Sequence, residues 1–329
     1  MTHPVQAGPD ASTDRHRRTA RARLRTGIDW PFVWHGIGNV VAGIAFAWGV
    51  VTVLSWVRPA ALFDDAILYW RATDAWVTGG DPWTVRYNDV VFAGIPPTLL
   101  VNLPLIPFGE WIAKPFWAIT GLAGAIAMIR HFRLPPWWLL FPPLIEAWLP
   151  GSPDPALAGL AVVGVGAFAA LAKPYMIPAM LADGRRVSIV IAVALGVVTL
   201  PILPWGRYFA EYSSIIATAS DQSGYRSFGD VLLLVPVGLV AIVILRRTGI
   251  ALAAPMLWPK PQWHYAMLSM GEISRSRILI VGFSVHIVWA GPASVVVLAA
   301  LVGVRAAWSM WRARRAPAAA PAPAAPSVP

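Results

Sequence analysis

Long apolar runs separated by short polar breaks make up most of this chain. The first run, 33–57, holds no Asp, Glu, Lys or Arg, and others follow at 111–129, 137–149, 156–172, 187–203, 231–245, 278–290 and 293–311. Because one crossing of a bilayer takes about 20 residues, the chain has room for roughly 8 to 11 crossings. We predict an all-α polytopic membrane protein. The run at 96–108 is too short to cross, which favours a re-entrant or broken helix.

The stretch from 63 to 83 interrupts this pattern directly after the first run. Its apolar and aromatic residues recur at the spacing of one helical face: Ala66, Tyr69, Trp70, Thr73, Trp76 and Val77. Asp65 falls at the cap or in the first turn, and Gly79–Gly80 ends the helix. We expect this helix to lie in the membrane interface, with its Trp and Tyr rings at headgroup level.

The placement of arginine predicts the topology. The net charge is +10, and the basic clusters lie at the ends of apolar runs and in the two tails. Since such clusters favour the cytoplasmic side, we expect a plasma-membrane protein with both termini in the cytoplasm. The helix at 64–77, a loop at 204–230 and the turn at 263–264 then lie outside, and Lys173 lies inside.

Composition limits the classes of protein to which this chain can belong. Hydrophobic residues make up 57% of the chain and charged residues 13%, against about a quarter charged in soluble domains. There is no cysteine, which excludes disulfides and thiol chemistry. The sequence shows no phosphate-binding glycine loop, zinc-ligand spacing or serine elbow. We divide the chain into a basic tail (1–30), a transmembrane domain (31–312) and a disordered Ala/Pro tail (313–329).

The chemistry expected outside combines a carboxylate with cations. Asp65 could act as a general base on an alcohol, while His264 and basic residues stabilise the growing charge of a phosphate leaving group. The candidate cations are Arg207, Arg226 and Lys260. A divalent metal could share that task, although no carboxylate cluster requires one, and we assign no metal ligand.

Four motifs in order resemble the polyprenyl-phosphate-mannose-dependent mannosyltransferases, glycosyltransferase family 87 of the C-type (GT-C) superfamily. They are Asp65 with Tyr69, Trp70, Ala72 and Gly80-Asp81-Pro82-Trp83; Ile95-Pro96-Pro97; Lys173-Pro174; and Trp263-His264-Tyr265. The chain departs from the family pattern at two places. Ile95 precedes Pro-Pro where the family usually has tyrosine, and the region from 155 to 186 lacks one membrane span.

The resemblance implies a GT-C-like bundle of about 9–11 membrane helices with an external interfacial helix. It also implies an inverting transfer of mannose from polyprenyl-phosphate mannose to a hydroxyl of a cell-envelope glycolipid or glycan. Asp65 would be the base and His264 would hold the donor phosphate. Substrate contacts would come from Asp64, Tyr69, Arg207, Arg226, Lys260, Trp263 and Tyr265. The expected partners are these substrates and membrane lipids, with no nucleic acid and no cofactor beyond the lipid-linked donor.

Other interpretations stay open at this point. Asp65 could be only a helix cap, His264 a packed interfacial histidine, and Lys173 a structural residue. We expect Asp64 to be a solvated neighbour that raises the pKa of Asp65. The whole chain could instead be a lipid-linked-sugar transporter, or an inactive homologue that acts as a partner in an envelope complex.

Overall fold

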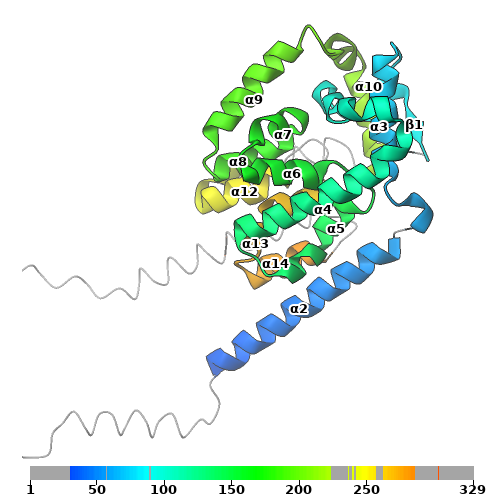
Figure 1. Cartoon of the computed structure of the whole chain (residues 1–329). Coiled ribbons are helices and arrows are strands. Elements are labelled where there is room, and N and C mark those ends of the chain that lie inside the picture. The colour runs from blue at the N-terminus through cyan, green and yellow to red at the C-terminus, as the bar shows by residue number, and fades with distance from the viewer. Residues whose placement is uncertain are drawn as a thin grey trace, which may run out of the picture.

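The structure is a computed structural model that describes residues 30–56, 58–88, 90–223, 236, 239–240, 242–256, 262–285 and 303. These residues are helical apart from loops and one antiparallel ribbon, in which β1 (Arg86–Tyr87) pairs with β2 (Val90–Val91) (Figure 1). The prediction of an all-α fold is therefore confirmed for this part of the chain.

The first apolar run forms one long helix, α2 (Trp30–Trp56), which packs on α5 (Pro142–Trp148) and α14 (Arg277–Ser284) (Figure 1). A β-carbon at Gly49 would lie 2.0 Å from the carbonyl oxygen of Ser284, so only glycine allows this approach. Two stretches of the described chain are long and apolar enough to cross a membrane, Val33–Trp56 and Glu110–Phe132.

A second close contact joins α4 (Ala113–Phe132) to α6 (Asp154–Val163). A β-carbon at Gly124 would lie 2.1 Å from the carbonyl oxygen of Pro155, and one at Gly159 would lie 2.3 Å from the α-carbon of Gly124. Small residues at a crossing let two helices approach to backbone contact. This contact fixes the position of Asp154 at the start of α6.

The run at 156–172 does not cross from one end of the bundle to the other, as we had expected. It forms a hairpin of α6 and α7 (Gly166–Ala172), which turns at Gly164 in the left-handed conformation (φ +107°). The chain therefore returns to the end from which it started. The predicted placement of Lys173 on the side opposite Asp154 is wrong, because a glycine ends α6 inside a run that looks continuous.

The helix that follows the first run is confirmed as α3 (Asp64–Val77), and Gly79 (φ +83°) lies just beyond its end. It packs on α4 and on 3₁₀ turns at Pro96–Val101, Leu103–Phe108 and Glu110–Ile112. These turns confirm the expected broken helix at 96–108. The buried face of α3 differs from the predicted one, since it includes Ile67, Leu68 and Ala72, whereas Val77 is exposed.

Other expected boundaries change. The run at 137–149 is split into a 3₁₀ turn (Pro136–Leu140) and α5, and the described part of the expected 204–230 loop is a helix, α10 (Trp205–Ser223). The remaining helices are α8 (Ile177–Ala182), α9 (Arg186–Thr199), α12 (Arg247–Met256) and α13 (Met270–Ile273). The span expected at 278–290 is described as far as residue 285 and contains most of α14, whereas most of the spans expected at 231–245 and 293–311 lies outside the described residues.

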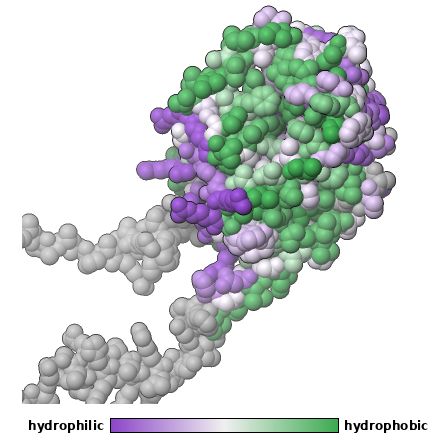
Figure 2. Space-filling model, in the orientation of Figure 1, coloured by the Kyte–Doolittle hydropathy of each residue, from purple (hydrophilic) through white to green (hydrophobic). Residues whose placement is uncertain are grey.

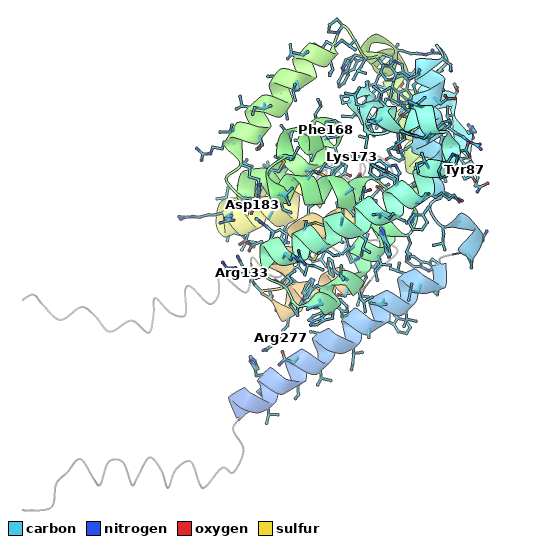
Figure 3. The ribbon with its side chains drawn as sticks, viewed as in Figure 1. Tyr87, Arg133, Phe168, Lys173, Asp183 and Arg277 are labelled. Carbon is cyan, nitrogen blue, oxygen red and sulfur yellow. The ribbon has the colours of Figure 1, made fainter. Side chains whose placement is uncertain are left out.

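Basic residues gather at one end of the bundle. Arg133, Asp183 and Arg277 lie toward that end, and Lys173 and Tyr87 lie toward the other (Figure 3). Asp183 pairs there with Arg247 at 3.0 Å and with His131 at 3.8 Å. Apolar surface covers much of the face between the polar ends (Figure 2). A cluster of basic residues is thus observed at this end, but Arg71 on α3, Arg86 on β1 and Arg207 on α10 lie on elements away from it.

Candidate functional site

The beginning of α3 is bonded to the end of α5. Phe63 precedes the helix in the left-handed conformation (φ 61°), and its amide donates to the carbonyl of Leu149 at 2.9 Å. The amide of Asp65 donates to the carbonyl of Pro150 at 2.8 Å. These two bonds place the Asp65 side chain, in the first turn of α3, beside the helix that carries Glu146.

A cavity of about 270 Å³ opens between α3, α5, α10 and the 3₁₀ turn at Trp263–Ser269. Five ionisable side chains from five segments line it: Asp65, Glu146, Asp154, Lys173 and His264. Tyrosines form much of the remaining wall: Tyr69, Tyr175, Tyr208, Tyr212 and Tyr265. The cavity therefore combines charged groups with aromatic rings.

Lys173 and Asp154 form the buried centre of this site. Nζ of Lys173 lies 3.1 Å from Oδ1 of Asp154 and donates to the hydroxyl of Tyr69 at 2.7 Å. Burial alone would raise the pKa of Asp154, but Lys173 and the hydrogen bond from His264 hold that pKa well below its ordinary value. Burial opposes the charge of Lys173, yet Asp154 raises the pKa of Lys173 above its ordinary value. Both groups are therefore charged at neutral pH.

His264 lies between two carboxylates. Its Nε2 is 3.0 Å from Oδ2 of Asp154, and its Nδ1 is 2.8 Å from Oε2 of Glu146. Burial disfavours the imidazolium, but Glu146 and Asp154 together raise the pKa of His264 to about 10. Each ring nitrogen therefore carries a proton at neutral pH, and His264 is a fixed cation rather than a base.

Asp65 has the environment of a general base. Its side chain is partly buried at the cavity wall. Burial raises the pKa of Asp65 and the charges of His264 and Lys173 partly offset that rise, so the pKa lies at about 6. A carboxylate with a pKa close to the working pH is ionised and still basic enough to accept a proton.

The structure brings four of the predicted site residues to this cavity: Asp65, Tyr69, His264 and Tyr265. The ring of Tyr265 stacks on Tyr175 with 3.9 Å between the ring centroids. The pairing of Asp65 with His264, which we predicted from sequence, is therefore observed as a shared cavity.

Asp64 does not line the cavity. It is buried, accepts a hydrogen bond from Asn88 at 2.8 Å and lies 3.3 Å from Nζ of Lys114. The expectation that Asp64 is a solvated neighbour of Asp65 is wrong, because the first turn of a helix points consecutive side chains in different directions. Asp64 ties the start of α3 to α4.

The remaining predicted contacts lie elsewhere. Arg207 on α10 pairs with Asp81 at 2.8 Å and with Glu211 at 3.1 Å, and it is not part of the cavity wall. The indole of Trp263 donates to the carbonyl of Phe283 at 2.9 Å and packs in the core. Arg226 and Lys260 lie outside the described residues.

Sequence analysis missed Glu146 and Asp154 and misplaced Lys173. A signal for Glu146 was present, since it is an acid within an apolar run, and such residues usually have a functional partner. Asp154 looked like part of a surface turn because it follows Gly151-Ser152-Pro153. In the described part of the chain, no group of three or more His, Cys, Asp or Glu residues is arranged to hold a metal ion.

Comparison with known proteins does not extend this description. The chain matches no protein-family model, no curated protein and no solved structure.

Proposed function

We propose that this chain is a membrane glycosyltransferase that moves a sugar from a polyprenyl-phosphate donor to a hydroxyl group. The observation that carries the proposal is the shared cavity of Asp65 and His264, in which a carboxylate of raised pKa lies near fixed cations. General base catalysis and stabilisation of a phosphate leaving group are the two functions that such a transfer needs.

The chemical step uses groups of the cavity wall. Asp65 takes the proton of the acceptor hydroxyl, and the acceptor oxygen forms a bond to the anomeric carbon of the sugar. The bond from that carbon to the phosphate oxygen breaks, and the phosphate leaves with the electron pair. Attack opposite the leaving group inverts the configuration. The charges of Lys173 and His264 favour the build-up of negative charge on the phosphate.

A membrane location is supported by exposed apolar side chains along two helices. Val40, Ile44 and Val51 on α2 and Val187 and Val190 on α9 are each more than half exposed. Exposed apolar surface of this extent needs a lipid or protein partner. The basic residues at one end suit the cytoplasmic side. Lys173, which lines the cavity, lies away from that end, and we propose that the cavity opens on the external side. We therefore propose a multi-pass protein of the plasma membrane with both termini inside.

Mannose as the sugar and a cell-envelope glycolipid or glycan as the acceptor follow from the motifs rather than from the cavity. The Gly80-Asp81-Pro82-Trp83 motif forms a turn in which Oδ1 of Asp81 accepts from the amide of Trp83 at 3.0 Å. The indole of Trp83 donates to the carbonyl of Gly94 at 2.9 Å, so this motif shapes the wall near α3. Its contribution to the reaction is support of the cavity.

The test is sugar transfer by purified protein in lipid, with radiolabelled polyprenyl-phosphate mannose and candidate glycolipids. We expect Asp65→Asn to fold and to lose transfer by roughly 100-fold or more, since it removes the base and keeps the shape. Asp74→Asn is the matched control, because Asp74 lies on α3 outside the cavity. Near-normal transfer by Asp65→Asn would overturn the proposal.

A further inference from the structure

Both cations of the described cavity lining already have carboxylate partners, so Lys173 or His264 can pair with a phosphate only if one of these carboxylates gives way. Three carboxylates and two cations form its described lining, so it carries one negative charge when all five are ionised. Both nitrogens of His264 and the Nζ of Lys173 already lie within 3.1 Å of a carboxylate. A phosphate entering this arrangement would meet net like charge among largely buried side chains, which is unfavourable.

The two carboxylates on His264 differ in how firmly they are held. The Asp154 side chain is 2% exposed, and its two oxygens bridge Lys173 and His264. The Glu146 side chain is 33% exposed and pairs with His264 alone among the described residues. Glu146 can therefore turn toward water, whereas Asp154 cannot move without breaking both of its ion pairs.

We infer that Glu146 is an exchangeable partner of His264, and that a phosphate oxygen of the ligand replaces it on Nδ1. The exchange keeps Nδ1 paired with an anion before and after binding. It also removes one negative charge from the place where the phosphate arrives. Glu146 thus competes with the ligand for the same donor. The inference rests on the proposed function in taking a phosphate as the ligand.

The competing interpretation is that Glu146 only orients the imidazole. The two roles predict opposite effects of the same substitution on binding. If Glu146 competes, Glu146→Gln removes the competing charge and the ligand binds more tightly. If Glu146 only orients His264, the same change loosens the ring and the ligand binds no more tightly than before.

The experiment measures binding of two probes, farnesyl phosphate and inorganic phosphate, to protein in nanodiscs of zwitterionic lipid. We expect Glu146→Gln to bind farnesyl phosphate about tenfold more tightly than the unmodified chain. Glu272→Gln is the matched control, since it makes the same charge change at the arginine-rich end and pairs with Arg275. It should leave binding unchanged. Tighter binding of farnesyl phosphate alone supports exchange by a lipid-linked phosphate, and tighter binding of both probes supports exchange by free phosphate too.

Unchanged or weaker binding of farnesyl phosphate by Glu146→Gln overturns the inference. A second measurement does not depend on the folding of that variant. In the unmodified chain labelled with ¹⁵N-histidine, farnesyl phosphate should shift the Nδ1 resonance of His264, which is identified among the 6 histidines by its loss in His264→Gln. If the Nδ1 resonance of His264 does not shift at saturating farnesyl phosphate, the inference is also overturned. Neither readout uses sugar transfer. A protein that shows the exchange but transfers no sugar would therefore contradict the proposed function and support this inference.

Discussion

Nζ of Lys173 lies 3.1 Å from Oδ1 of Asp154 because the α6–α7 hairpin returns the chain to its starting point. Asp154 begins α6 and Lys173 follows α7, so the two-helix hairpin brings together the partners of a buried ion pair. The pair lines the cavity, where Asp154 also pairs with His264. The ion pair of Lys173 and Asp154 therefore affects both the stability of the bundle and the geometry of the site.

Removal of one partner of this pair should be costly. We expect Lys173→Met to lower the free energy of unfolding by about 3 kcal/mol, since it leaves a buried carboxylate without its lysine. The exposed pair of Arg275 and Glu272 is the control, and Arg275→Gln should cost less than about 1 kcal/mol. Denaturation in detergent measures both. Equal, small losses for the two variants would contradict the assignment of a buried pair.

The pH dependence of transfer should follow the ionisation of Asp65. Its pKa is raised to about 6, and only the ionised form accepts a proton. We expect the initial rate to fall about tenfold for each pH unit below that value. His264, with a pKa of about 10, stays protonated across this window. Initial rates between about pH 5 and about pH 8 give the profile, and a flat profile would exclude Asp65 as the base.

Asp65→Asn should also make the protein more stable at neutral pH. The pKa of Asp65 in the fold lies above its ordinary value of 3.8, so the folded chain binds this proton more tightly than the unfolded chain. That contribution to stability is complete below about pH 4 and is lost as the pH rises to about 6. Asparagine avoids the loss, and we expect a gain of about 3 kcal/mol at pH 7 but almost none at about pH 4. Thermal unfolding at the two pH values checks this. A variant less stable at pH 7 would show that the buried carboxylate is stabilising.

The packing of α2 depends on one glycine. We expect Gly49→Ala to separate α2 from α14, because its β-carbon would lie 2.0 Å from the carbonyl oxygen of Ser284. Gly43→Ala on the same helix meets nothing within 4 Å and should be neutral or slightly stabilising. Overpacking of this kind typically costs about 1–3 kcal/mol. Limited proteolysis and detergent denaturation distinguish the two variants, and identical behaviour would contradict the contact.

Sequence analysis predicted the helices whose formation depends on the pattern of neighbouring residues. The helical spacing from Ala66 to Val77 and the glycines after it were enough to predict α3, and an apolar run of sufficient length was enough for α2. Asp65 and His264 were found because each lies in a motif of several unusual residues. For these helices and motif residues, the local sequence pattern was sufficient to predict what the structure shows.

The rest of the site depends on contacts between distant segments. Gly164 within an apolar run is compatible with either a continuous span or a hairpin, and only packing against α4 and α9 distinguishes them. Glu146 lies in an apolar stretch whose period does not show which face it occupies. The role of Asp154 depends on a lysine and a histidine that are far from it in the sequence. No pattern in the sequence around Asp154 identifies Lys173 and His264 as its partners.

Gly164 gives the chain a vulnerable point far from the candidate site. It lies at the tip of the hairpin, ten residues of α6 away from Asp154, or about 15 Å at 1.5 Å per residue. Its φ of +107° is strained for any L-amino acid with a side chain. A random mutagenesis screen for loss of activity should therefore recover substitutions at this position, even though none of them would touch a substrate.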